Sequence, residues 1–120
     1  MKNLTLIISV ILTLAGVATS HSAEQLRNIT ITRVYQYEDL IVIAYYPASS
    51  NIDGCTKTAA NSHFAIPLTT DPTSGIKKGL DYYATILAAK MNDIPIGAGV
   101  RGCHLWGDGT IPVVYRVDLY

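Results

Sequence analysis

The feature that most constrains this chain is one helical pattern late in the sequence, with strand-like segments on both sides. Residues 75–91 (GIKKGLDYYATILAAKM) place apolar side chains at helical spacing. This stripe consists of Ile76, Leu80, Tyr83, Leu87 and Met91. Asp71, or alternatively Thr73 or Ser74, would cap the start of the helix. A single helix cannot bury this stripe alone, so we expect the strands before and after it to provide cover.

Five segments around the helix have the composition of β-strands, because they are rich in β-branched and aromatic residues and are bounded by turn residues. They are residues 29–37, 40–46, 63–69, 94–105 and 111–120. The predicted order is β-β-β-α-β-β, which is the order of an OB-fold, a five-stranded barrel. We therefore predict a mainly β (α+β), OB-fold-like barrel with one helix at about 75–91. An α+β sandwich with the helix on one face is the alternative.

The first two segments are expected to be covered differently. Residues 29–37 alternate strictly, which predicts that Ile31 and Tyr35 share one face. Residues 40–46 (LIVIAYY) are almost continuously apolar, which predicts a strand buried on both faces. Residues 24–28 are polar, and we expect them to be a lead-in to the first strand.

Residues 1–20 have the features of a secretory signal peptide: Lys2, then an apolar run, then small residues suited to cleavage after Ser20 or Ala23. The apolar run is shorter than the roughly 18–20 residues that a membrane-spanning helix needs. We therefore expect a secreted or periplasmic protein without a transmembrane anchor. Residues 24–120 would form its single domain, which is a common domain size.

The charge of the chain is balanced, with 9 basic and 9 acidic residues. Removal of Lys2 with the signal peptide would leave 8 basic and 9 acidic residues, a net charge of −1. Proteins that bind nucleic acid usually carry a basic patch or stripe, and the sequence has none. We therefore expect no nucleic-acid partner.

Two cysteines, Cys55 and Cys103, are present. In an exported domain, two cysteines most often form a disulfide, and this is our prediction. The alternative is a metal site that also recruits His63 and His104, but the sequence lacks the paired spacing of such sites. We expect no metal.

No catalytic constellation stands out in the sequence, and nothing in it argues for a glycosidase-like pair of carboxylates, although the scattered aspartates leave that alternative open. Residues 97–102 (GAGVRG) match a dinucleotide-binding pattern, but that pattern requires a preceding strand and a following helix. Here the expected helix precedes the glycines and more strand follows them. His63 and His104 are not near a serine in a nucleophile-elbow motif. We therefore predict a protein that is not an enzyme and has no cofactor.

The most informative candidate site is the glycine-rich loop that follows the fourth strand. It contains Trp106, Asp108 and Thr110, which we predict to be ligand-binding residues. The apolar face of a sugar ring can stack on an indole, while carboxylate and backbone groups bind its hydroxyls. In OB-folds the loop between the fourth and fifth strands belongs to the region that binds oligosaccharides and oligonucleotides. The alternative is that Trp106 plugs the end of the barrel.

The C-terminal half, roughly residues 70–120, resembles the B subunits of cholera toxin and heat-labile enterotoxin. The shared features are the Lys77-Lys78 pair at the start of the helix, Cys103, Trp106, Thr110 and Pro112. The spacing differs in one respect, since His104 and Leu105 separate the cysteine from the tryptophan where the family has one residue.

The resemblance implies that Trp106 is a platform on which a terminal galactose stacks and that Asp108 is a polar partner for that sugar. It also implies a ring of five subunits that carries an enzymatic A subunit. The related B subunits of pertussis-like and subtilase toxins bind sialylated glycans at other surfaces, so the resemblance does not identify the sugar.

Two functions are therefore expected from the sequence. The first is a secreted, non-enzymatic, receptor-binding subunit of a bacterial toxin, forming a homopentamer that binds a cell-surface glycan. The alternative is a small periplasmic inhibitor or immunity-type protein that binds a partner enzyme.

Overall fold

The computed structural model describes residues 24–51, 53–70, 72–75 and 77–120. Three expectations fall outside these residues: the signal peptide within residues 1–23, the helix cap at Asp71 and the contribution of Ile76 to the helix stripe. Within the described part of the chain, no helix combines the length and the apolar content needed to cross a membrane.

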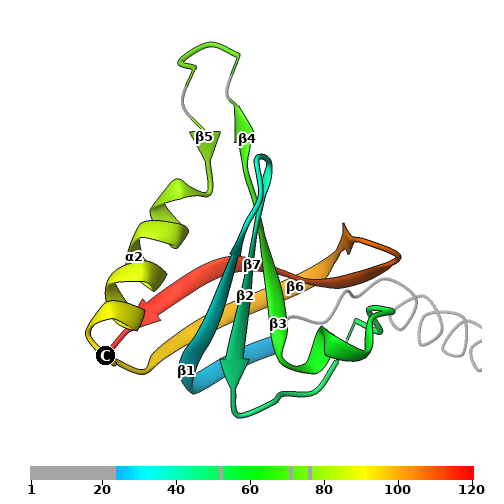
Figure 1. The fold of residues 1–120 in the computed structure, drawn as a ribbon, viewed down its shortest axis with the longest axis vertical. Coiled ribbons are helices and arrows are strands. Elements are labelled where there is room, and N and C mark those ends of the chain that lie inside the picture. Colours follow the sequence, from blue (N-terminus) through cyan, green and yellow to red (C-terminus); the bar gives the residue numbers. More distant parts are fainter. Residues whose placement is uncertain (1–23, 52, 71, 76) are drawn as a thin grey trace, which may run out of the picture.

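Five strands form a closed barrel in the order β1-β2-β3-β7-β6 (Figure 1). The elements are β1 (Glu24–Gln36), β2 (Leu40–Tyr46), η1 (Thr58–Asn61), β3 (His63–Pro67), β4 (Thr69–Thr70), β5 (Lys77–Lys78), α2 (Leu80–Met91), β6 (Ile96–Trp106) and β7 (Gly109–Leu119). β3 and β7 pair in parallel, while the other neighbours in the barrel pair antiparallel. This topology, with a helix between the third and fourth barrel strands, confirms the predicted OB-fold-like barrel.

The barrel closes through β1, which pairs with two different strands. Its first part, from Glu24 to Ile29, pairs with β6, and its second part, from Thr30 to Gln36, pairs with β2. The change of partner falls between Ile29 and Thr30. Just before it, the pairing with β6 shifts register between Leu26 and Ile29, and Asn28 within this shift has a positive φ of 51°, a conformation that asparagine tolerates better than most residues. The expectation that residues 24–28 are only a lead-in is therefore wrong, because their backbone closes the barrel although most of their side chains are polar.

The strict alternation expected for β1 is also interrupted. The pairing of β1 with β2 shifts register between Ile31 and Arg33. A β-bulge adds one residue to one strand, so the side chains beyond it change face. Ile31 consequently lies in the barrel core, while Tyr35 packs on a different cluster and Val34 takes the core side.

The buried residues form two clusters. The main cluster fills the barrel, and its most completely buried large side chains include Phe64, Ile41, Ile43, Ile66, Ile86 and Ile96. The second cluster is Leu40, Val42, Ala65 and Ile111, with Tyr35 and Trp106 packed against it. Along β2, Leu40 and Val42 alternate with the core residues, so the second cluster lies on the outer face of the barrel wall. This confirms the prediction that β2 is buried on both faces.

The helix is shorter than expected and turns a different side to the core. It begins at Leu80, after Gly79 with φ 94°, and Lys77 and Lys78 belong to β5 and do not open the helix. A Cβ on Gly79 would lie 2.7 Å from the carbonyl oxygen of Pro67. This close approach fixes the crossing of the helix start over the end of β3, which explains why the helix cannot start earlier.

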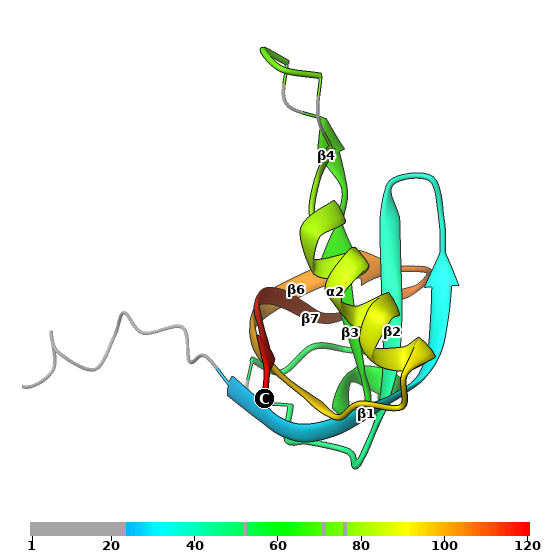
Figure 2. The ribbon, with the colours of Figure 1, turned by 90° about the vertical axis from the view of Figure 1, so that its left-hand side faces the viewer.

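The buried side of α2 is centred on Ile86 and Ala89, with Tyr82 and Tyr83 partly buried against the same cluster. α2 packs against β1 and β7 along one side of the barrel (Figure 2). The expected stripe is rotated from this side by roughly 100°, one residue of helical turn. Its members Leu80 and Met91 are 42% and 77% exposed.

β4 and β5 form a separate two-stranded hairpin between β3 and α2. It projects from the end of the barrel in both views (Figures 1 and 2). Its base is held by Lys77, whose Nζ donates to the carbonyl oxygen of Glu38 at 3.2 Å, and by the Leu68 N–H, which donates to the carbonyl oxygen of Asp39 at 2.9 Å.

The rotation of the helix can be tested with a pair of alanine substitutions. Ile86→Ala removes a fully buried side chain, and we expect it to lower the free energy of unfolding by about 2–5 kcal/mol. Leu80→Ala acts on a side chain that is already 42% exposed, and we expect a loss below about 1 kcal/mol. Urea titrations monitored by circular dichroism measure both. A loss for Leu80→Ala that equals or exceeds the loss for Ile86→Ala would contradict the rotated position of the helix.

Candidate functional site

Two turns meet beside the second cluster and flank an open, shallow hollow of about 450 Å³. One turn joins β1 to β2 and the other joins β6 to β7. The hollow is lined by Tyr37, Glu38, Asp39, Leu40, Leu105, Trp106 and Gly107. These two turns correspond to the loops with which OB-folds bind oligosaccharides and oligonucleotides. We call this space the turn hollow.

Trp106 is half-buried in the wall of the turn hollow. Its Nε1 donates a hydrogen bond to the Tyr37 hydroxyl at 3.1 Å. The indole meets the ring of Tyr35 edge-on with 5.3 Å between centroids, and it stacks near His63 at 5.5 Å. The Nζ of Lys57 lies over the indole, 4.6 Å from its centroid. Trp106 therefore borders the hollow and at the same time covers the outer cluster, so only part of its ring is available to a ligand.

Asp108 belongs to the turn between β6 and β7 and does not line the turn hollow. Its side chain is 97% exposed and its Oδ1 is 3.3 Å from the Nζ of Lys57. A second hollow of about 370 Å³ lies here, lined by Thr56, Lys57, Thr58, Ala59, Asp108 and Gly109. Trp106 and Asp108 thus line two different hollows, although the Nζ of Lys57 contacts both side chains. A surface ion pair of this kind contributes little stability, so Asp108 can exchange its lysine for a ligand at small cost.

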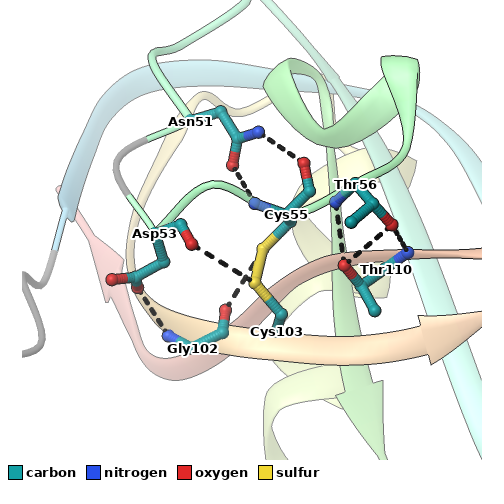
Figure 3. The surroundings of a disulfide bond; sticks show 7 residues. All are labelled: Asn51, Asp53, Cys55, Thr56, Gly102, Cys103 and Thr110. Carbon is teal, nitrogen blue, oxygen red and sulfur yellow. Dashed lines mark hydrogen bonds between the residues drawn. A yellow bond between two sulfur atoms is a disulfide. The ribbon is translucent and has the colours of Figure 1, made fainter.

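Thr110 has a structural partner, Thr56 (Figure 3). The N–H of Thr56 donates to Oγ1 of Thr110 at 2.8 Å, and the N–H of Thr110 donates to Oγ1 of Thr56 at 2.9 Å. The N–H of Lys57 donates to the carbonyl oxygen of Thr110 at 3.0 Å. Thr110 lines neither hollow, so its hydroxyl serves to hold the loop before η1 against β7.

The predicted disulfide is present and joins the loop after β2 to β6 (Figure 3). Cys55 and Cys103 are 48 residues apart in sequence, and their Cα atoms are 5.6 Å apart. Cys55 is buried, whereas Cys103 is exposed. Beside the disulfide, the N–H of Gly102 donates to Oδ2 of Asp53 at 2.6 Å. The side chain of Asn51 bonds both the N–H and the carbonyl oxygen of Cys55, at 2.9 and 2.7 Å.

The two histidines considered as metal ligands have other surroundings. Nδ1 of His63 is 3.0 Å from the Ser62 hydroxyl and 3.2 Å from the Ala59 carbonyl oxygen. Burial lowers the pKa of His63, and the nearby Lys57 ammonium lowers it further, against an opposing hydrogen bond to Ala59. Nδ1 of His104 is 2.8 Å from the carbonyl oxygen of Leu105. Among the residues that the structure describes, no three His, Cys, Asp or Glu side chains gather in a way that could hold a metal ion.

Three residues that line the hollows have no binding role predicted from the sequence. They are Tyr37 and Leu105 in the turn hollow and Lys57 in the second hollow. The sequence pattern places Tyr37 at the end of the first strand. Its position just before the acidic turn, combined with the OB-fold order of strands, is the signal that could place it beside the β6–β7 turn. Leu105 is 70% exposed, and its strand pattern alone does not distinguish an outward position from a buried one. Lys57 carries no local signal, because only the disulfide and the Thr56–Thr110 contacts bring it to the site.

Comparison of the chain with protein-family models, with curated proteins and with solved structures finds no significant match. The fold does not by itself indicate a function, because unrelated activities share the same barrel. The assignment of function therefore depends on the two hollows and on the residues that line them.

The lowered pKa of His63 predicts a pH-dependent stability. The folded protein binds a proton at His63 more weakly than the unfolded chain, whose ordinary pKa is 6.5. This contribution to stability is complete above 6.5 and is lost as the pH falls below that value towards the lower folded pKa. We expect His63→Gln to show a smaller fall in melting temperature between about pH 7.5 and about pH 5 than the wild type. An identical fall in both proteins, measured by thermal unfolding, would contradict this role of His63.

Proposed function

We propose that the chain is a non-enzymatic glycan-binding subunit, of the kind that bacterial toxins use to attach to cells, and that its glycan binds in the turn hollow. The observation that carries this proposal is the position and lining of that hollow. It lies between the two turns that form the ligand region of OB-folds, and its walls combine exposed apolar side chains with hydrogen-bonding groups, as ligand sites do.

The lining favours a sugar over a nucleic acid, the other common ligand of this fold. Tyr37 and Leu105 are 49% and 70% exposed, and together with the free part of the Trp106 ring they offer apolar surface to the C–H face of a sugar. Glu38 and Asp39 add carboxylates that accept hydrogen bonds from sugar hydroxyls. The same carboxylates repel a phosphate backbone, and binding of nucleic acid depends on basic residues that neutralise phosphates.

The proposed site differs from the open indole platform that the resemblance implies. Because His63, Lys57 and Tyr35 already contact the indole, the sugar would meet Trp106 at the part of its ring that borders Tyr37 and Leu105. Asp108 would contribute from the second hollow only to a ligand long enough to cross the turn. Asp108 and Trp106 therefore remain proposed ligand residues, each reached from a different hollow. Thr110 supports the site through its hydrogen bonds with Thr56.

Assembly into a ring of identical subunits, with an enzymatic A subunit as a further partner, is part of the same proposal. Its support is an exposed apolar surface at the ends of α2 and β7, which lie close together beside the C-terminus (Figure 1). A groove of about 390 Å³ there is lined by Ala84, Thr85, Ala88, Ala89, Asn92, Ile94 and Leu119. Ile94 and Leu119 are 45% and 63% exposed, and Met91 and Tyr120 are 77% and 70% exposed. Contiguous apolar surface of this kind marks association sites.

A glycan array with four proteins tests the proposed site. Leu105→Ala removes an exposed side chain, so it should fold normally, and we expect it to weaken glycan binding about tenfold or more, since burying a leucine side chain contributes about 1.5–3 kcal/mol. Trp106→Ala should reduce binding at least as much. Tyr46→Ala, at the opposite end of β2 and 70% exposed in the wild type, is the control and should bind like the wild type. Unchanged binding by Leu105→Ala and Trp106→Ala would remove the site from the turn hollow.

Light scattering of the mature protein tests the assembly. A homopentamer has about five times the subunit mass, and substitution of Leu119 by Glu should shift that assembly towards the monomer by placing a charge in the apolar groove. A monomeric wild type would contradict the ring. A monomer that also binds no glycan, and that recovers an enzyme in a pull-down, would favour the inhibitor or immunity-type function.

A further inference from the structure

A short segment crosses the β6–β7 hairpin and is tied to both of its strands. We call residues 53–57 the strap. The disulfide from Cys55 to Cys103 joins it to β6, and the hydrogen bond from the Gly102 N–H to Asp53 lies beside that joint (Figure 3). On the other side, the strap bonds β7 through Thr110. The strap therefore has one covalent tie and several hydrogen bonds.

The strap ends at Lys57, whose side chain lies across the β6–β7 turn. A Cβ on Gly109 would be 2.6 Å from the Lys57 Cγ, and a Cβ on Gly107 would be 3.4 Å from the Lys57 Nζ. The glycines of the turn thus leave the room that the lysine occupies. From there Nζ reaches over the Trp106 indole, 4.6 Å from its centroid, and pairs with Asp108 at 3.3 Å. Lys57 therefore forms a cover over the indole and a wall of the second hollow.

We propose that the Cys55–Cys103 disulfide is a redox-sensitive clasp that holds Lys57 over Trp106, so that reduction by a dithiol releases the strap and uncovers the indole while the barrel stays folded. The contacts that remain after reduction are all non-covalent. Besides the bonds between Thr56 and Thr110, they include the bond from the Lys57 N–H to the Thr110 carbonyl oxygen, the bond from the Gly102 N–H to Asp53 and the bonds of Asn51 to Cys55. The bonds between Thr56 and Thr110 lie at the exposed surface, where water replaces them readily, and the pair of Lys57 with Asp108 is also at the surface.

The barrel does not depend on the clasp for its core. Neither cysteine belongs to the main cluster or to the second cluster. The five barrel strands are joined by their own backbone pairing, and the strap lies outside that pairing. Reduction therefore removes a tie between a loop and the barrel surface, and the side chains that fill the barrel keep their neighbours.

The exchange begins at Cys103, because this cysteine is exposed and Cys55 is buried. One thiolate of the dithiol attacks Sγ of Cys103, forms a mixed disulfide and releases Cys55 as a thiolate, which takes up a proton. The second thiol of the reductant then attacks the mixed disulfide and releases Cys103 as a thiol. Two electrons pass from the dithiol to the cysteine pair, and the reductant leaves as its own disulfide. The clasp functions in this way whichever ligand the turn hollow binds.

Trp106 reports on the clasp directly, because it is the one tryptophan in the chain. We expect treatment of the folded protein with dithiothreitol to shift the fluorescence emission of Trp106 to longer wavelength and to increase its quenching by acrylamide. Far-UV circular dichroism should keep its β signal, and a thiol reagent should titrate both cysteines. The variant Cys55→Ser/Cys103→Ser should show the same fluorescence without reductant. If this variant fails to fold, the reduction of the folded wild type still gives the answer.

A matched pair of lysine variants separates the cover from the clasp. Lys57→Ala should show raised quenching in the oxidised protein and little further response to dithiothreitol, whereas Lys78→Ala, which changes an exposed lysine of β5, should respond like the wild type. Three results would overturn the proposal: a disulfide that resists dithiothreitol in the folded protein, unchanged quenching after both thiols have titrated, or loss of the β signal on reduction. The last result would make the disulfide a staple of the fold.

Discussion

The rest of this structure depends on the closure of the barrel through β1. A single strand changes partner between Ile29 and Thr30, from β6 to β2, and this joins the two halves of the sheet. Closure removes the free strand edges that an open sheet would expose. It also brings the β1–β2 turn beside the β6–β7 turn, because the two hairpins that carry these turns are joined in one closed sheet. The turn hollow is thus a consequence of closure, and its position does not require any special residue in the turns.

The sequence predicts the number, order and type of the barrel elements because their hydrophobic patterns are strong. The continuous apolar run of β2, for example, needs burial on both faces, and it has that burial in the barrel and under Trp106. The pattern fails where tertiary contacts decide. The start of α2 is set by the close approach of Gly79 to Pro67. The side chains of β1 change faces at a bulge between Ile31 and Arg33, and no residue type there predicts a bulge. Apolar spacing alone therefore predicts the wrong buried side for the helix.

The candidate site shows the same limit in its chemistry. Trp106, Asp108 and Thr110 are adjacent in the sequence, and this proximity suggests one pocket. In the structure, however, Trp106 and Asp108 line different hollows and Thr110 bonds the strap. Tyr37 and Leu105, which complete the turn hollow, come from positions that are distant in sequence or indistinct in pattern. Only the fold brings them together, since side chains from two hairpins meet there.

Packing and the proposed ligand binding place opposite requirements on the exposure of the Trp106 ring. The outer cluster requires that the indole stay packed against it, because Leu40, Val42 and Ile111 would otherwise face water. The proposed binding of a sugar requires that some of the indole be free. The contacts of Tyr35 and His63 with the indole satisfy the first requirement, whereas Lys57, the last residue of the strap, lies over the ring from outside both clusters. Lys57 is therefore the member of this group that can leave without disturbing a cluster, because its charged end returns to water at small cost, while the aromatic neighbours cannot move without exposing apolar surface. An indole that packs on a cluster and also meets a ligand therefore needs a cover that is polar and attached from outside the core.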